Sequence, residues 1–249
     1  MEEATRVVLV EFPKVFGIDL SITNEVVLLW LGAIVTFLLA VAACRGREAA
    51  TRGRFRNLFE MLVEMVEKEV IGGNANKATR ALTPFLLTMF FFILVCNLLG
   101  MVPIPGVFKA VTSNINVTAG LAIAVFALTV VAEVSHHGVL GFLGRFMPAG
   151  IPRWAGVFLV PIEIASWLVR PLSLAVRLFA NMVVGHVLLF VLIGMAVASG
   201  WWIVGVLPAA AAVVMSCFEL FVCFIQAMVF TLLAGLYLKE AVEGHQATH

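Results

Sequence analysis

Charged residues are scarce in this sequence. Only 12% of its 249 residues are Asp, Glu, Lys or Arg, whereas a soluble globular domain has about 25%. Because 62% of the residues are hydrophobic, a soluble domain is excluded and a polytopic membrane protein is predicted. The formal net charge of +1 provides no basic surface for nucleic acid, so we expect membrane lipid and protein partners instead.

Several motifs are also missing. The four cysteines show no CxxC spacing, so neither a disulfide framework nor a zinc site is indicated, and we interpret them as packing residues. No P-loop, GxGxxG, GxSxG or HExxH pattern occurs, which argues against nucleotide binding and zinc proteolysis. We therefore expect no catalytic residue, no cofactor and no metal site. No internal repeat supports an inverted-repeat transporter, and residues 1–23 lack the features of a cleaved signal peptide, so the first span is expected to be retained.

Long apolar runs dominate what is present. Five segments are predicted to be membrane-embedded helices: 24–43, 82–101, 117–134, 155–199 and 201–238. The predicted fold class is an all-α membrane protein, with 1–249 forming a single membrane domain.

The last two runs are unusually long. As straight helices they would measure roughly 67 and 57 Å, about twice the thickness of a hydrocarbon core. They must tilt steeply or break at Pro161, Pro171 or Pro208. Because no loop bearing Lys or Arg lies within either run, we favour a long, strongly tilted hairpin.

A further segment, 55–71, has apolar and charged residues on opposite sides at helical spacing and is too charged to span. We expect an amphipathic helix at the cytoplasmic interface; packing on another subunit would give the same pattern. Five arginines lie between residues 45 and 56, so the positive-inside rule places the N-terminus outside and, after five crossings, the C-terminus in the cytoplasm. A second cytoplasmic loop is expected after residue 134, carrying His136, His137, Arg145 and Arg153.

A polar stripe interrupts the run 155–199. Glu163, Arg170 and Arg177 recur every seven residues and so lie near one face of a helix, with Asn181 one turn beyond. A buried arginine at membrane depth usually faces a partner, water or an ion route. Arg177 has no acid three or four residues away, so its counter-charge comes from another helix or another chain. An ion pair with Glu219 is the alternative within this chain.

Two features of the stripe and the hairpin leave alternatives open. Arg170 precedes Pro171 and serves either to cap carbonyls freed by a kink or in function. In an antiparallel hairpin, His186 and Glu219 lie at similar depth and can meet. Such a pair is typical of a proton relay, because imidazole titrates near neutral pH, but a purely structural hydrogen bond would use the same residues.

The segment PLSLAVRLFANMVVGH (171–186) resembles the signature of subunit a of the F-type ATP synthase, of the bacterial and mitochondrial type. The resemblance extends to TPFLLTMFFFILVCNLLGMVP (83–103) and to Glu219 and Gln226 in the last run. It implies a non-catalytic stator beside a rotating ring of c subunits, flanked by b-type peripheral stalk subunits. Proton flow through two offset half-channels would then drive rotation and ATP synthesis.

The resemblance also implies roles for individual residues. Arg177 would be the essential arginine that faces the rotor carboxylate and separates the half-channels. The half-channel open to the outside would contain Asn181, His186, Glu219, Gln226 and Asn116, and the one open to the cytoplasm Glu163 with Ser166. Asn114 stands where some relatives have an acid. We expect protons as the coupling ion and a bacterial inner membrane as the location, with the mitochondrial inner membrane as the alternative.

Two other functional classes are compatible with the residues alone. A stand-alone secondary transporter would use Arg177 as a counter-charge for its substrate, and it would contain both partners of its buried charges. A passive membrane anchor would use its polar residues only to hold helices together. The stator, by contrast, needs a second subunit for any activity.

Overall fold

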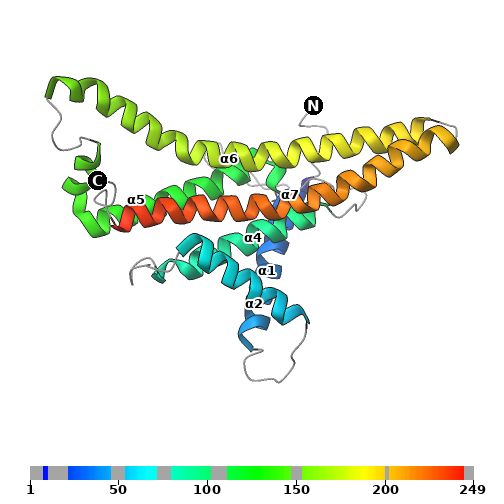
Figure 1. Ribbon diagram of the computed structural model, residues 1–249, viewed down its shortest axis with the longest axis horizontal. Helices are drawn as coiled ribbons and strands as arrows, with labels where there is room; N and C mark the ends of the chain where they lie inside the picture. Colours follow the sequence, from blue (N-terminus) through cyan, green and yellow to red (C-terminus); the bar gives the residue numbers. More distant parts are fainter. Residues whose placement is uncertain are drawn as a thin grey trace. The chain divides into compact units, whose positions relative to one another are not determined.

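The computed structural model describes residues 8–10, 22–45, 54–71, 80–101, 111–146, 153–199 and 202–243. Its helices are α1 (Asn24–Arg45), α2 (Arg54–Val66), η2 (Glu67–Ile71), α4 (Thr83–Met101), η3 (Val111–Ser113), α5 (Ile115–Arg145), α6 (Arg153–Ala198) and α7 (Trp202–Glu243) (Figure 1). Two short strands, β1 (Val8–Val10) and β2 (Ile22–Thr23), pair antiparallel and were not expected from the sequence. All other regular structure in the described ranges is helical.

Five of these helices are long and apolar enough to cross a membrane. The qualifying segments are Asn24–Ala42, Thr83–Met101, Ile115–Val139, Ala155–Ala198 and Val204–Val242. A helix satisfies its backbone hydrogen bonds within the segment, which is why apolar runs of this length fold this way in lipid. The predicted all-α membrane fold with five membrane-embedded helices is confirmed.

The predicted helix over 55–71 is present as α2 followed by the π-helix η2. Between residues 57 and 69, exposed and half-buried side chains are interspersed, and Val66 is fully buried. Its place at the membrane interface stays a prediction.

Helix α5 continues well beyond the end predicted at residue 134. His136, His137 and Arg145, expected in a loop, are helical, and the chain bends at Gly138, whose φ of 71° is open mainly to glycine. The segment after the bend packs back on α6. Trp167 has ring centroids of Phe142 and Phe146 at 5.5 and 5.7 Å, and this aromatic cluster explains why the segment folds as a helix.

Helices α6 and α7 are continuous over 46 and 42 residues. Pro161, Pro171 and Pro208 lie inside them without dividing them. At 1.5 Å per residue, α6 is about 69 Å long and α7 about 63 Å, so the prediction of two long helices rather than four short spans is confirmed. Their tilt in the membrane stays a prediction.

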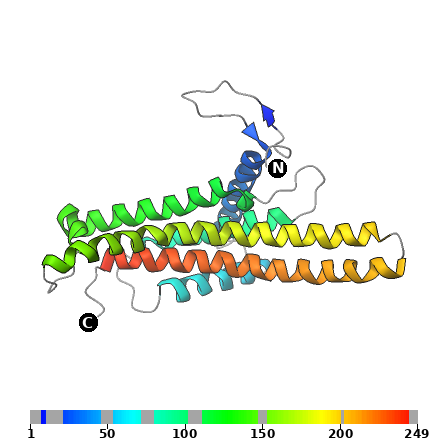
Figure 2. The same cartoon turned by 90° about the horizontal axis from the view of Figure 1, so that it is seen from above.

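The residues group into two compact units, each with its own buried core. Unit 1 comprises Met1–Arg56, Phe91–Asn114 and Phe179–Ala227, and unit 2 comprises Asn57–Phe90, Ile115–Leu178 and Met228–His249. In unit 1 the end of α6 and the start of α7 run side by side (Figures 1 and 2). The prediction that the whole chain forms a single membrane domain is not tested by this grouping.

A sulfur cluster forms part of the core of unit 1. The Sγ atom of Cys223 lies 3.7 Å from the Sδ atom of Met101 and 3.9 Å from that of Met182. Cys223 and Met182 are fully buried. This contact joins α7 to α6 and α4 within the unit. In unit 2 the fully buried side chains include Phe90, Leu174, Leu178 and Phe230.

Candidate functional site

Arg177 lies on an exposed face of α6 in unit 2. Ser166, Val169, Ser173 and Val176 lie on this face as well and are also exposed, whereas Leu174 and Leu178 on the other side are buried. Among the described residues of unit 2, no acid forms an ion pair with Arg177. The guanidinium of Arg177 is therefore exposed at the surface of unit 2 and has no ion pair among the described residues of that unit.

Glu163 and Ser166 lie about four and three turns before Arg177 on the same helix. Glu163 is half-buried and Ser166 is exposed. Neither makes a hydrogen bond or an ion pair with another described residue of unit 2. The stripe predicted from the sequence is thus present as a row of polar side chains on α6.

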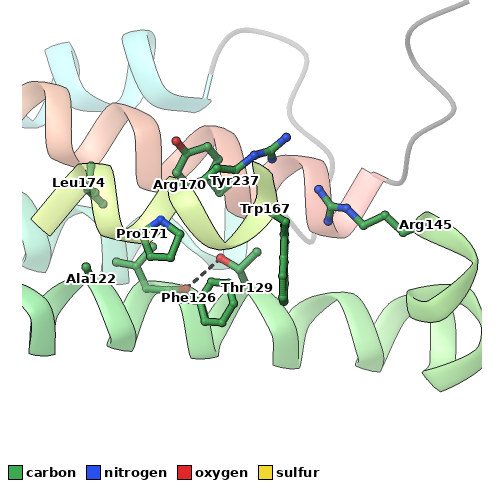
Figure 3. A pocket seen from close by; sticks show the side chains of 10 residues that line it. Ala122, Phe126, Thr129, Arg145, Trp167, Arg170, Pro171, Leu174 and Tyr237 are labelled. Atoms are coloured by element: carbon green, nitrogen blue, oxygen red, sulfur yellow. Dashed lines mark hydrogen bonds between the residues drawn. The ribbon is translucent and has the colours of Figure 1, made fainter. Parts of the chain in front are cut away.

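Arg170, the other member of the stripe, is paired. Its Nη1 atom donates to Glu240 Oε2 at 2.7 Å, and its guanidinium carbon lies 5.4 Å from the ring centroid of Tyr237. Glu240 also accepts from Arg145, which in turn donates to Glu133. Arg145, Trp167, Arg170 and Tyr237 line a pocket in unit 2 (Figure 3). Of the two roles left open for Arg170, capping of freed carbonyls is not the one observed.

In unit 1, His186 and Glu219 come together as the depth of the two positions predicts. The Nδ1 atom of His186 lies 3.4 Å from Glu219 Oε1, and the Glu219 side chain is only 4% exposed. Both ring nitrogens also face a backbone carbonyl: Nδ1 is 2.8 Å from the oxygen of Met182, and Nε2 is 2.9 Å from that of Gly100. Gly100 lies in the last turn of α4, where carbonyls lack an intrahelical partner.

This arrangement suits a group that changes its charge. A neutral imidazole has one N–H and donates to one of the two carbonyls, whereas a doubly protonated ring donates to both. Glu219 then provides the counter-charge. At 3.4 Å the carboxylate and the charged ring form an ion pair but no hydrogen bond, so both oxygens of Glu219 stay available to another partner.

Gly185 makes room for the Glu219 carboxyl. A Cβ atom at position 185 would lie 2.5 Å from Oε1 and 2.9 Å from Cδ of Glu219. No real Cβ contact is this short, so a side chain at this position would displace the carboxyl group. The glycine thereby sets where the acid sits beside His186.

Other buried polar atoms of unit 1 lack a protein partner. Asn97 of α4 is fully buried; its Nδ2 donates to the Cys223 carbonyl at 3.3 Å, while its Oδ1 accepts nothing. Gln226 of α7 is 6% exposed, and its Nε2 is also unpaired. Cys223 lies one turn after Glu219 and about one turn before Gln226, so all three are on one side of α7. Buried polar atoms of this kind usually bind ordered water, which is how a proton path is made.

Two predicted asparagines, Asn181 and Asn116, remain, together with Asn114, to which the sequence assigned no role. Asn181 is half-buried in unit 1, and Asn116 is exposed in unit 2 and has a partner. Asn114 donates to Glu25 of α1 within unit 1, so a carboxylate does lie at the position where the sequence alone shows only an amide.

Sequence reasoning missed Asn97, Glu133 and Glu240. An isolated asparagine in an apolar helix is usually a helix contact, so Asn97 gave no signal of its own. Glu133 did give a sequence signal, because an acidic residue inside an apolar run requires a partner. Glu240 lies just past the predicted end of the last helix at residue 238. Within the described ranges, no three His, Cys, Asp or Glu side chains are placed to hold a metal ion.

Comparison with known proteins gives a consistent result. The family model ATP synthase A chain matches residues 26–239. The chain is 41% identical to ATP synthase subunit a of Magnetococcus marinus, over 93% of this chain and 88% of the relative. It is 40% identical to the same subunit of Acidiphilium cryptum, over 92% of each chain. It is 36% identical to that of Anaplasma phagocytophilum, over 98% of this chain and 99% of the relative.

Proposed function

Because the chain belongs to the ATP synthase A chain family, we propose that it forms two offset proton half-channels separated by Arg177. A subunit a is the proton-channel stator of the Fo sector and is not itself catalytic. In our proposal, Arg177 faces a carboxylate on each c subunit of the rotor ring. Protons then cross the membrane only by riding on that ring.

The exposure of Arg177 carries this proposal. An arginine at membrane depth costs from about 2.5 to more than 10 kcal/mol unless it is paired or hydrated. None of the described acids of its own unit forms an ion pair with Arg177, so we propose a carboxylate on another chain as its partner. A stand-alone transporter would contain both charges. A fixed cation favours the ionised form of an arriving carboxyl and so releases its proton, and it also blocks a continuous proton wire.

The outer half-channel in this proposal passes His186 and Glu219. The imidazole and the carboxyl lie 3.4 Å apart, close enough to exchange a proton through one bridging water molecule. The unpaired atoms of Asn97, Glu219 and Gln226 support a hydrated path in unit 1. Asn181 and Asn116 are proposed members of the same half-channel, on the basis of the family resemblance.

The inner half-channel in this proposal follows α6 past Glu163 and Ser166. These two residues lie on the helix that carries Arg177, in the same unit, and they are not closed by ion pairs within it. An acid about 21 Å along the axis from Arg177 can take up protons without contacting the arginine.

The proposed setting is a bacterial inner membrane, with the N-terminus outside and the C-terminus in the cytoplasm. The five arginines between residues 45 and 56 support this orientation. As a subunit of the Fo sector, the chain assembles with other subunits. We propose the c-ring and the b-type peripheral stalk as its direct neighbours.

Replacement of Arg177 tests the proposal. In the whole ATP synthase, reconstituted in liposomes, Arg177→Ala should abolish ATP synthesis driven by a proton gradient while assembly and uncoupled ATP hydrolysis persist. The reason is that the rotor carboxylate loses its counter-charge and the two half-channels lose their separator. Ser173→Ala, one turn away on the same exposed face, is the matched control and should keep full coupling. Wild-type coupling in Arg177→Ala would eliminate the stator mechanism.

A further inference from the structure

Two arginines in the middle of α6 differ in their ion pairing, and the family role of Arg177 does not explain the difference. Arg170 and Arg177 are seven residues apart, so they lie about 10 Å apart along the axis and within about 20° of one face. Arg177 has no ion pair among the described residues of unit 2, whereas Arg170 is bound by Glu240 at 2.7 Å. One face of α6 therefore carries two guanidinium groups: that of Arg170 is neutralised by Glu240, and that of Arg177 has no ion pair among the described residues of unit 2.

Glu240 is shared between two arginines. Its Oε2 atom accepts from Arg170 and its Oε1 atom accepts from Arg145, each at 2.7 Å. Arg145 is 6% exposed, and its other terminal nitrogen donates to Glu133 at 2.6 Å. The four charges sum to zero, and all four residues belong to unit 2. Figure 3 shows Arg170 and Arg145 approaching from α6 and from the end of α5.

Removal of the Glu240 charge would change the two arginines unequally. Arg145 would keep Glu133 and remain neutralised. Among the described residues, Arg170 would lose its one ion pair and would retain the contact with Tyr237. Its side chain is 31% exposed, so the freed cation would act beyond the surface of the unit. In a medium of low dielectric constant, attraction falls off only with the inverse of distance, so a second cation about 10 Å from the first competes for the same anion.

We propose that Glu240 is a positioning residue for proton coupling, which neutralises Arg170 so that Arg177 is the single cation offered to the rotor carboxylate. This inference rests on the stator function proposed above. Without Glu240, a passing carboxylate would meet two attractive positions on α6. It would dwell at the wrong one, and rotation would slow.

A double variant separates this role from a structural tie between three helices. We would measure ATP-driven proton pumping and thermal stability of the whole enzyme in liposomes. Glu240→Gln should pump roughly tenfold more slowly, which corresponds to about 1.4 kcal/mol. Adding Arg170→Gln removes the competing cation, so the double variant should return to within about twofold of wild type. Lys239→Gln, next to Glu240 on α7, changes a charge outside the network and should pump normally.

The double variant decides the question even if Glu240→Gln alone fails to assemble. If the double variant pumps as slowly as Glu240→Gln, or more slowly, Glu240 acts as a tie and the proposal is wrong. Wild-type pumping by Glu240→Gln would also overturn it. Arg177→Ala, measured in parallel, identifies which idea fails: coupling retained there refutes the stator mechanism, whereas coupling lost there with no rescue by Arg170→Gln refutes only the role of Glu240.

Discussion

Gly185→Ala should slow proton transport without weakening the fold. The new Cβ atom would lie 2.5 Å from Oε1 of Glu219, so the carboxyl must retreat by about 1 Å to reach ordinary van der Waals contact. Glu219 now lies 3.4 Å from His186, and its movement would change the geometry of the proposed proton relay. Glycine is also the poorer helix former, so alanine should add about 0.5–1 kcal/mol of helix stability at this position.

The expected magnitude follows from the displacement. A misplacement of about 1 Å at a reacting group costs up to roughly 100-fold in rate. We therefore expect proton-driven ATP synthesis to fall between about tenfold and 100-fold, with a thermal midpoint that is unchanged or higher. A second substitution tests the cause: Glu219→Asp shortens the acid by about 1.5 Å, so it should restore part of the activity lost in Gly185→Ala.

The assay is passive proton flux and ATP synthesis by the whole enzyme in liposomes. Gly194→Ala is the matched control, because it lies on the same helix in the same unit and its Cβ would meet nothing within 4 Å. The control should conduct protons normally. Normal flux in Gly185→Ala, or an equal loss in Gly194→Ala, would refute the idea that Gly185 positions the acid.

Two further predictions concern a buried amide and an exposed ion pair. Asn97→Leu should lower proton flux severalfold, because the amide oxygen proposed to hold water is lost. If the variant instead loses more than about 1.5 kcal/mol of stability, the main role of Asn97 is its hydrogen bond to the Cys223 carbonyl. Glu64 lies 2.8 Å from Lys68, whose hydrogen bond and charge lower the pKa of Glu64, and the pKa of Lys68 is raised in return. The pair is complete above the ordinary glutamate pKa and is lost as pH falls through the lowered pKa. Lys68→Gln should therefore raise the pKa of Glu64 in a carbon NMR titration, and an unchanged midpoint would contradict this reasoning.

The lengths of the apolar runs predicted the helices well because lipid leaves the backbone few alternatives. Counting residues from the hairpin turn also placed His186 beside Glu219, since rise per residue is nearly constant in a helix. The lack of an acid one turn from Arg177 predicted that its own helix does not neutralise it, but left open whether the partner is another helix or another chain. These inferences depend only on local geometry and spacing.

The parts that could not be predicted depend on contacts between distant residues. Arg145 and Glu240 are 95 positions apart, and nothing in either segment alone indicates the other. The bend at Gly138 looked like a loop because two histidines and a glycine interrupt the apolar pattern, yet aromatic packing on Trp167 makes the segment helical. The unpaired oxygen of Asn97 likewise appears only when α4 and α7 are packed together in unit 1.

Arg170 is neutralised by an ion pair within this chain, whereas Arg177 is not, and this difference determines how easily each could bind a carboxylate on a moving rotor. Breaking a buried ion pair by removing one partner costs about 3–5 kcal/mol. If Arg177 had an acid of its own chain beside it, each arriving rotor carboxylate would have to displace that acid, and a barrier of this size would slow every step by roughly 100-fold or more. In the proposed mechanism, the exposed guanidinium avoids that barrier but needs the c-ring to shield it from lipid. The subunit should therefore be less stable in a membrane by itself than in the assembled enzyme, and much of the difference should disappear in Arg177→Ala.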